Sequence, residues 1–261
     1  MSRTIAFMAV FLLGSATPAI AQDGCASEIP FGDNDDAGRL ATVGNSRVYF
    51  ETYGDSTHPT LVLIHGNGGS ISAMRCQIVH FMTDYHVVVA DNRTHGKSGG
   101  SDHLTYDQMA DDYATILDDL ALDSVYVLGQ SDGGIIGLLL AIDHPRKVGK
   151  LVAAVPNLRP GKSAIKQWEL DLSAEYRAMI DSMIARGDES RDWQNEKVHM
   201  ELMVNEPHIT LTDLHKISSP VLVVTSDDDI IKPRHILEIY ENIPNAQLFV
   251  MPGATHFMLR D

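Results

Sequence analysis

The sequence predicts an α/β fold, with a mostly parallel, eight-stranded sheet, helices on both faces and a small helical cap. Short, continuous apolar runs rich in β-branched residues recur along the chain, and such runs are typical of strands buried on both faces of a parallel sheet. Segments with helical periodicity separate these runs, and strand–helix alternation builds such a sheet. One long helical insertion interrupts the alternation and predicts the cap.

The expected elements follow a polar lead-in over residues 22–37. Alternation of apolar and polar residues predicts a first strand over 48–53. The apolar runs place further strands at 61–64, 87–90, 125–128, 151–155, 221–224 and 248–251. Helical patterns cover 106–120, 134–144 and 234–242. The insertion, 157–219, carries Met and Trp side chains that we expect to pack the cap.

The composition fits one globular domain and limits its partners. The chain has 261 residues, of which 44% are hydrophobic and 21% are charged, so a large core can form. A formal net charge of −15 argues against nucleic acid or an anionic membrane as partner and leaves a small-molecule substrate as the expected one. No stretch after the N-terminal segment is long and apolar enough to predict a membrane-spanning helix.

Residues 1–21 have the pattern of a cleaved signal peptide. Arg3 supplies a positive start, and residues 5–13 form an apolar segment that is too short to cross a bilayer. The Ala-Ile-Ala sequence at 19–21 then matches a cleavage site. We therefore expect a mature hydrolase domain over 22–261 that is exported to a periplasm or secreted.

The chain contains two cysteines, Cys25 and Cys76. In an oxidising compartment such a pair often forms a disulfide, which here would fasten the mature N-terminus to the body of the domain. Two free thiols are the alternative. The expectation of a disulfide therefore depends on export.

The strongest chemical signal is Gly-Gln-Ser-Asp-Gly at 129–133, a G-x-S-x-G pattern. It follows a predicted strand and precedes a predicted helix, which is the context of a nucleophile on a sharp strand-to-helix turn. Glycines two residues before and after the serine allow the chain segments to approach closely. Ser131 is therefore the candidate nucleophile, at a helix N-terminus that favours developing negative charge.

A serine needs a base and an orienting carboxylate to attack an acyl group. His256 follows the last predicted strand and leaves the sheet at the same carboxyl edge as Ser131, whereas the other histidines lie before the serine, on predicted helices or in the cap. The acid is expected in the run Asp227, Asp228 and Asp229, which follows another predicted strand. The residues alone leave the choice among these aspartates open.

Acyl transfer also needs backbone N–H groups that stabilise the oxyanion. One is expected from Asp132, the residue after the nucleophile. The second is expected from the Gly-rich loop at 65–69, where the backbone amide of Asn67 is the candidate. Asp132 is also a candidate substrate-binding residue, because its carboxylate could favour a positive charge near the scissile acyl group. Alternatively, it only complements the helix N-terminus.

The order of these motifs resembles the α/β-hydrolase superfamily: the 65–69 loop, Asp-Asn-Arg-Thr-His-Gly-Lys-Ser at 91–98, the serine turn, an Asp-x-Asp loop and a Gly-x-x-His loop. The resemblance covers about residues 48–258. It implies the fold of that family and a Ser-Asp-His triad whose acid is Asp229, with Asp227 as the alternative. The Ser-Asp-Gly-Gly turn and short cap are similar to the valacyclovir-hydrolase-like branch, which implies amino-acid esters as a substrate type.

The sequence departs from the family pattern at two points. Thr94 stands where the family usually has glycine. The family also normally adds a final helix after the histidine loop, whereas this sequence ends at Asp261. Either the sequence is truncated or the protein leaves that face of the sheet open, and without the helix we expect the loop that carries His256 to be less firmly held.

These features predict a serine hydrolase, similar to carboxylesterases, that cleaves a small carboxylic ester or related acyl bond through an acyl-enzyme. The sequence has no metal-ligand motif and no phosphate-binding Gly-rich loop, so no metal and no other cofactor is expected. A cofactor-free perhydrolase or haloperoxidase and an aminopeptidase are alternatives that use the same triad. A ligand-binding protein on the same fold is the non-enzymatic alternative.

Overall fold

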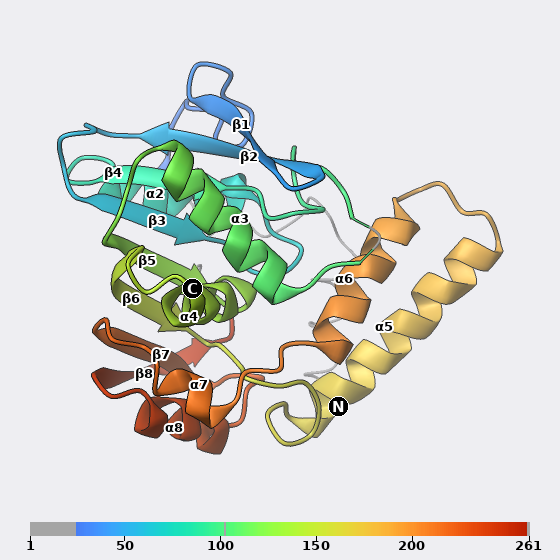
Figure 1. Ribbon diagram of the computed structural model, residues 1–261. Coiled ribbons are helices and arrows are strands. Elements are labelled where there is room, and N and C mark those ends of the chain that lie inside the picture. Colours follow the sequence, from blue (N-terminus) through green and yellow to red (C-terminus); the bar gives the residue numbers. More distant parts are fainter. Residues whose placement is uncertain (1–24, 102, 260–261) are drawn as a thin grey trace.

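The computed structural model describes residues 25–101 and 103–259 and is built around an eight-stranded sheet (Figure 1). The strand order is β1-β2-β4-β3-β5-β6-β7-β8; β2 pairs antiparallel with both β1 and β4, and all other neighbouring strands pair in parallel. The strands are β1 (Gly38–Val43), β2 (Ser46–Tyr53), β3 (Thr60–Ile64), β4 (His86–Ala90), β5 (Val125–Gln130), β6 (Val148–Ala154), β7 (Val221–Asp228) and β8 (Ala246–Thr255). The helices are η2 (Ile71–Met74), α2 (Arg75–Phe81), α3 (Tyr106–Asp119), α4 (Asp132–Asp143), α5 (Gln167–Ala185), α6 (Trp193–Asn205), α7 (Leu211–Leu214) and α8 (Pro233–Asn242). The predicted signal peptide, residues 1–21, lies outside the described residues.

This architecture confirms the predicted fold class, and each predicted strand and helix overlaps an observed one. The sequence pattern does not place β1, because this edge strand buries only Ala41 and Val43 and its alternation is correspondingly short. The short helix α2 is also not predicted. Its helical pattern is weak because Ile78 is its only fully buried side chain.

Side chains of the central strands alternate between two separate cores, as the two-residue repeat of a strand requires. On one face, Val62 and Ile64 belong to the core formed with α3, α4 and α8. On the other face, Leu61 and Leu63 pack with α2. Helix α4 is the most deeply buried helix, with every residue from Asp132 to Ile142 inside. The core therefore fixes the N-terminus of α4, which follows Ser131 directly.

Between β6 and β7 the chain forms the cap helices α5 and α6, which lie side by side along one edge of the sheet (Figure 1). They pack through Ile180, Trp193 and Met200. Trp193 is thus a packing residue, as expected, whereas Trp168 is 44% exposed. Within residues 25–101 and 103–259, no helix combines the length and apolar character that crossing a membrane requires.

The polar lead-in is held against the sheet by the buried carboxylate of Glu51. This carboxylate accepts hydrogen bonds from the backbone N–H groups of Gly32 at 2.9 Å and Asn34 at 3.0 Å. It also accepts from the hydroxyls of Tyr49 at 2.8 Å and Tyr53 at 2.7 Å. Four donors satisfy a carboxylate that is fully buried, so Glu51 has a structural role.

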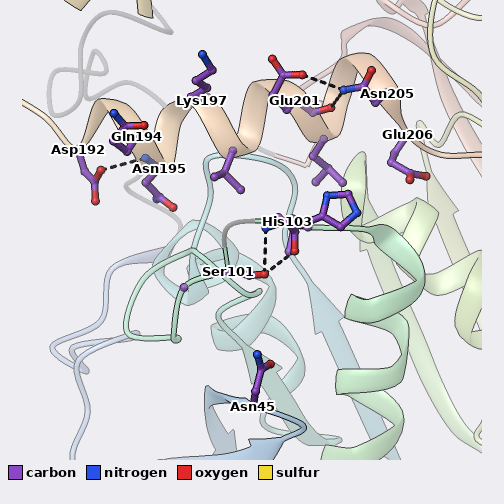
Figure 2. A pocket seen from close by; sticks show the side chains of 14 residues that line it. Asn45, Ser101, His103, Asp192, Gln194, Asn195, Lys197, Glu201, Asn205 and Glu206 are labelled. Atoms are coloured by element: carbon purple, nitrogen blue, oxygen red, sulfur yellow. Dashed lines mark hydrogen bonds between the residues drawn. The ribbon is translucent and has the colours of Figure 1, made fainter. Parts of the chain in front are cut away.

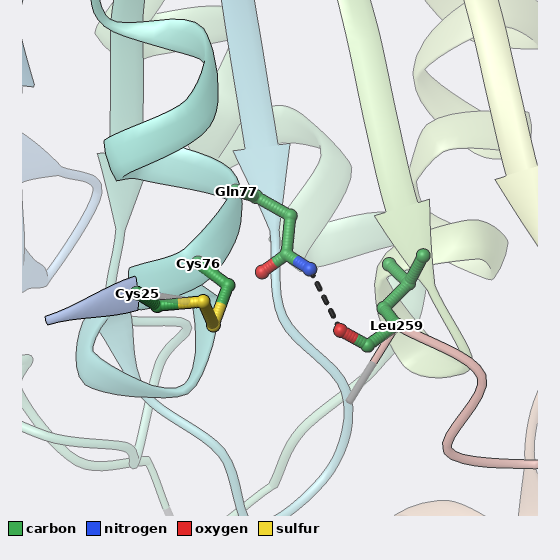
Figure 3. Close-up of a disulfide and its surroundings, with 4 residues drawn as sticks. All are labelled: Cys25, Cys76, Gln77 and Leu259. Atoms are coloured by element: carbon green, nitrogen blue, oxygen red, sulfur yellow. Dashed lines mark hydrogen bonds between the residues drawn. A yellow bond between two sulfur atoms is a disulfide. The ribbon is translucent and has the colours of Figure 1, made fainter. Parts of the chain in front are cut away.

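Cys25 and Cys76 form a disulfide that fastens the start of the described chain to α2 (Figure 3). The predicted pairing is therefore confirmed. Next to it on the same helix, Gln77 Nε2 donates a 2.8 Å hydrogen bond to the backbone oxygen of Leu259 (Figure 3). Helix α2 thus connects both ends of the described chain.

Candidate active site

Ser131 lies in the tight turn between β5 and α4. Its backbone angles are φ 56° and ψ −118°, which are unusual for a residue other than glycine. Strand and helix are so close here that a Cβ on Gly129 would lie 2.0 Å from the carbonyl oxygen of Gly133. Glycine at position 129 is therefore required sterically. The turn leaves Ser131 partly exposed at the N-terminus of α4.

The Ser131 hydroxyl, the His256 imidazole and the Asp229 carboxylate form one hydrogen-bonded row. His256 Nε2 lies 2.9 Å from Ser131 Oγ, and His256 Nδ1 lies 2.7 Å from Asp229 Oδ1. The three residues lie at the carboxyl ends of β5, β7 and β8, which share one edge of the sheet. Asp229 and His256 are both buried. This geometry permits transfer of the serine proton to an imidazole that a carboxylate orients.

The structure distinguishes Asp227 from Asp229. Asp229 Oδ1 accepts both the imidazole contact and a 2.9 Å hydrogen bond from the backbone N–H of Ile231. Asp227 is exposed, and its Oδ1 accepts a 2.8 Å hydrogen bond from the backbone N–H of Gly253. Asp227 therefore supports the end of β8 that leads to His256, while Asp229 contacts the imidazole itself.

The Gly-rich loop after β3 lies against the serine turn. A Cβ placed on Gly66 would lie 3.2 Å from the Cβ of Ser131. In the described part of the chain, the backbone N–H of Asn67 has no hydrogen-bond partner. Asp132 is the first residue of α4, where backbone N–H groups have no acceptor within the helix. The two predicted oxyanion donors therefore come from the Gly-rich loop and from the first residue of α4.

The carboxyl group of Asp132 is buried rather than directed to solvent. It accepts a 3.0 Å hydrogen bond from Asn67 Nδ2, and the Tyr106 hydroxyl is a second donor to it. Burial raises the pKa of Asp132 to about 6, although both donors act in the opposite direction. The side chain therefore ties the serine turn to the Gly-rich loop. Its role in substrate selection stays a prediction.

Gln130, which precedes the nucleophile, supports the histidine loop. Its Nε2 donates a 2.9 Å hydrogen bond to the backbone oxygen of His256. Together with the contact between Gln77 and Leu259, it holds the loop for which the sequence predicted weak support. Gln130 and His256 are 126 positions apart, so no local sequence signal could have revealed their contact.

The loop after β4 connects α6 to the Gly-rich loop. The imidazoles of His95 and His199 stack with their centroids 4.0 Å apart, and His95 Nε2 accepts a 3.1 Å hydrogen bond from the backbone N–H of Gly68. Thr94, which replaces the usual glycine, has a φ of 65°, and its carbonyl oxygen accepts a 2.8 Å bond from Asn195 Nδ2. Burial lowers the pKa of His95 to about 3 and of His199 to about 4. Both rings are therefore neutral near pH 7.

The described residues form a polar hollow of about 660 Å³ outside the serine site (Figure 2). Among the same residues, no group of three or more His, Cys, Asp or Glu side chains could hold a metal ion. The hollow lies between α6 and the loop around Ser101, and its lining includes Asp192, Lys197 and Glu201 (Figure 2). None of the predicted site residues lines it. The hollow is therefore separate from the hydrogen-bonded row.

Comparison with known proteins supports the relationship that the motifs suggest. A family model described as alpha/beta hydrolase fold matches residues 59–172. A protein of Serratia proteamaculans (strain 568), named "Putative carbamate hydrolase RutD", is 30% identical over 250 residues. That alignment covers 81% of this chain and 90% of the relative.

Solved structures share the fold at lower sequence identity. The enol-lactonase from Burkholderia xenovorans LB400 matches with a TM-score of 0.69 and 20% identity, over 84% of this chain and 93% of its own. A carboxylesterase structure from Nitrososphaera gargenis matches with a TM-score of 0.70 and 23% identity, over 85% of this chain and 92% of its own. At these identities the likeness concerns the fold alone.

Proposed function

This chain belongs to the α/β-hydrolase fold family, and on that premise we propose that it is a serine hydrolase that cleaves small carboxylic esters or related acyl bonds. The observation that carries the proposal is the row in which His256 lies 2.9 Å from the Ser131 hydroxyl and 2.7 Å from the Asp229 carboxylate. A nucleophile, a base and an orienting acid in contact are the parts that acyl transfer through a serine requires.

In the first half of the proposed reaction, Ser131 Oγ attacks the substrate carbonyl carbon while its proton passes to His256 Nε2. Asp229 stabilises the resulting imidazolium through Nδ1. The negative charge on the former carbonyl oxygen is received by the backbone N–H groups of Asn67 and Asp132. The tetrahedral adduct then collapses, the leaving atom takes the proton from Nε2, and an acyl-serine remains.

In the second half, a water molecule replaces the leaving group. His256 accepts a proton from that water, which attacks the acyl carbon and forms a second oxyanion at the same two amides. Collapse releases the carboxylic acid and returns the proton from Nε2 to Ser131 Oγ. Besides substrate and water, the proposed cycle uses side chains and backbone groups of this chain. Hydrolysis of a carbamate, after which the relative is named, would use the same steps.

A fluorophosphonate probe tests the proposal directly, because it phosphonylates only a serine that a base activates. We expect stoichiometric labelling of the protein on Ser131, located by peptide mass spectrometry, and no labelling of Ser131→Ala. Failure of the wild-type protein to react would favour the ligand-binding alternative.

We also propose that the protein is exported and that residues 1–21 are removed. The N-terminal pattern supports this, and so does the disulfide between Cys25 and Cys76, since disulfides persist mainly in oxidising compartments. Expression with the native N-terminus in a bacterium, followed by cell fractionation and intact-mass measurement, tests the proposal. We expect a protein that begins at Gln22 outside the cytoplasm, and a full-length protein found only in the cytoplasm would refute export.

A further inference from the structure

Glu169, on the first turn of cap helix α5, has a buried carboxyl group with an unused acceptor. The residue is 8% exposed. Its Oε1 accepts a 3.3 Å hydrogen bond from Ser173, but its Oε2 is buried and has no hydrogen-bond partner among the described residues. Buried carboxyl oxygens without a partner are rare because desolvation is then not compensated. The Oε2 atom of Glu169 is therefore available to accept a further hydrogen bond.

The start of α5 is fixed to the loop that carries Asp229. The backbone N–H of Lys166 donates a 2.9 Å hydrogen bond to the oxygen of Ile230, and that of Lys232 donates a 2.7 Å bond to the oxygen of Ala164. An isolated antiparallel bridge between Ile165 and Ile231 joins the same two segments. Glu169 thus lies on the part of the cap that is attached to the proposed catalytic acid.

The causes of the pKa shift of Glu169 agree with a position near the proposed catalytic residues. Desolvation raises the pKa of Glu169, and a positive charge on His256 lowers it. The carboxyl group is therefore within electrostatic reach of the proposed catalytic base.

We propose that Glu169 is a specificity-determining residue that binds a hydrogen-bond donor, an ammonium or a neutral hydroxyl or amide group, on the leaving-group side of the substrate. The inference rests on the proposed function, in which His256 delivers its proton to the leaving atom. Because the start of α5 is bonded to the loop that carries Asp229, and Asp229 contacts His256, we place Glu169 on the leaving-group side; the oxyanion donors lie in the Gly-rich loop and at the start of α4. The proposed substrates are therefore esters whose leaving group carries a hydrogen-bond donor.

Asp132, the buried acid that follows the serine, is a weaker candidate for this role. Its carboxyl group is already used by Asn67 and Tyr106. Glu169 Oε2 has no partner among the described residues, and a substrate ammonium would form a charge-assisted hydrogen bond with it. A structural role of Glu169 as a first-turn acid that complements the α5 dipole would not require its burial.

The test uses three phenyl acetates of nearly equal shape, with an aminomethyl, a hydroxymethyl or an ethyl group in the para position of the leaving phenol. The readout is the kcat/KM of each donor-bearing ester divided by that of the ethyl ester, measured on one enzyme preparation. This ratio does not depend on the fraction of folded protein. We expect the wild-type enzyme to prefer the donor-bearing esters, and Glu169→Leu to lose about tenfold or more of both preferences.

Glu169→Gln separates the two kinds of donor, because glutamine keeps an acceptor oxygen and loses the charge. It should lower the preference for the ammonium ester while retaining that for the hydroxymethyl ester. Glu175→Gln, at an exposed acid of the same helix, is the matched control and should leave both ratios unchanged.

The outcomes distinguish this inference from the proposed function. If Glu169→Leu hydrolyses the esters with wild-type kcat/KM ratios, Glu169 does not determine substrate specificity, although the serine mechanism stands. If Asp132→Ala removes the preference while Glu169→Leu keeps it, the role belongs to Asp132 and the inference is overturned. If wild-type enzyme cleaves none of the three esters and resists the fluorophosphonate probe, both proposals fall.

Discussion

The side-chain amide of Asn67 donates a 3.0 Å hydrogen bond to the buried carboxyl group of Asp132. Asn67 lies in the Gly-rich loop and Asp132 begins α4, and their backbone N–H groups are the two proposed oxyanion donors. The hydrogen bond therefore fixes the distance between the donors without using either of them. Prearranged donors need little reorganisation when negative charge develops in the transition state. This preorganisation is the main source of catalysis by oxyanion-binding groups.

Asp132→Asn is expected to stabilise the fold at alkaline pH and to have little effect in acid. Burial raises the pKa of Asp132 to about 6, so the folded state holds a proton that the unfolded state releases at lower pH. The cost of ionising Asp132 is absent below the unfolded pKa of roughly 4, grows as pH rises to about 6 and stays constant above. It is on the order of 1–3 kcal/mol. Thermal unfolding of both proteins at pH 4.5 and pH 8 measures the difference, and equal gains at the two pH values would contradict the prediction.

Ser131→Ala should abolish ester hydrolysis. Loss of the nucleophile from a triad lowers kcat by about 10⁴-fold or more. Because the serine is partly exposed and the change only removes the hydroxyl, the thermal midpoint should stay close to the wild-type value. Initial rates with p-nitrophenyl acetate provide the test, and a variant within tenfold of wild type would remove Ser131 from the mechanism.

Asp229→Asn should be far more damaging than Asp227→Asn. Asp229 contacts the imidazole Nδ1, and an amide there disfavours the required tautomer and cannot stabilise the imidazolium. We expect a loss in kcat on the order of 10³–10⁴ for this variant. Asp227 is exposed and accepts a hydrogen bond from the backbone of Gly253 rather than from the imidazole, so its substitution should cost less than about tenfold. The opposite order of kcat values would assign the acid to Asp227.

Replacing Cys76 with serine should destabilise the fold. The disulfide joins residues 51 positions apart, and a cross-link of that span is worth at most about 4 kcal/mol through the unfolded chain. We expect a lower thermal midpoint and a free thiol at Cys25. The value of kcat should be nearly unchanged, because the disulfide lies at α2 and not in the row of Ser131, His256 and Asp229. Alkylation of unreduced wild-type protein is the control. Two reactive thiols there would contradict the disulfide.

The stacked pair His95 and His199 should make the protein sensitive to acid. Burial lowers both pKa values, to about 3 and about 4, so the unfolded state takes up protons at higher pH than the folded state. Stability should therefore be fully present above pH 7 and fall as pH drops from about 6.5 toward 4. His199→Phe keeps an aromatic ring that cannot be protonated and should flatten this slope in urea unfolding, whereas a change at the exposed His58 should not. An unchanged slope in His199→Phe would exclude the pair as its source.

The serine turn and most of the sheet could be predicted because their signals are local. The G-x-S-x-G spacing, the preceding apolar run and the following helical pattern are set by consecutive residues, and the tight approach of Gly129 and Gly133 explains why only glycine fits. The same local pattern leaves β1 undetected, since an edge strand that buries two side chains carries little periodicity.

The identity of the residues that meet around Ser131 was decided by tertiary structure. Asp227 and Asp229 are equivalent in the sequence pattern, yet only packing of the β7 and β8 ends brings Asp229 against the imidazole and leaves Asp227 on a loop backbone. The unused acceptor of Glu169 likewise has no sequence signature. Local backbone preference depends on neighbours along the chain, whereas contact between side chains depends on how strands and loops distant in sequence are placed by the core.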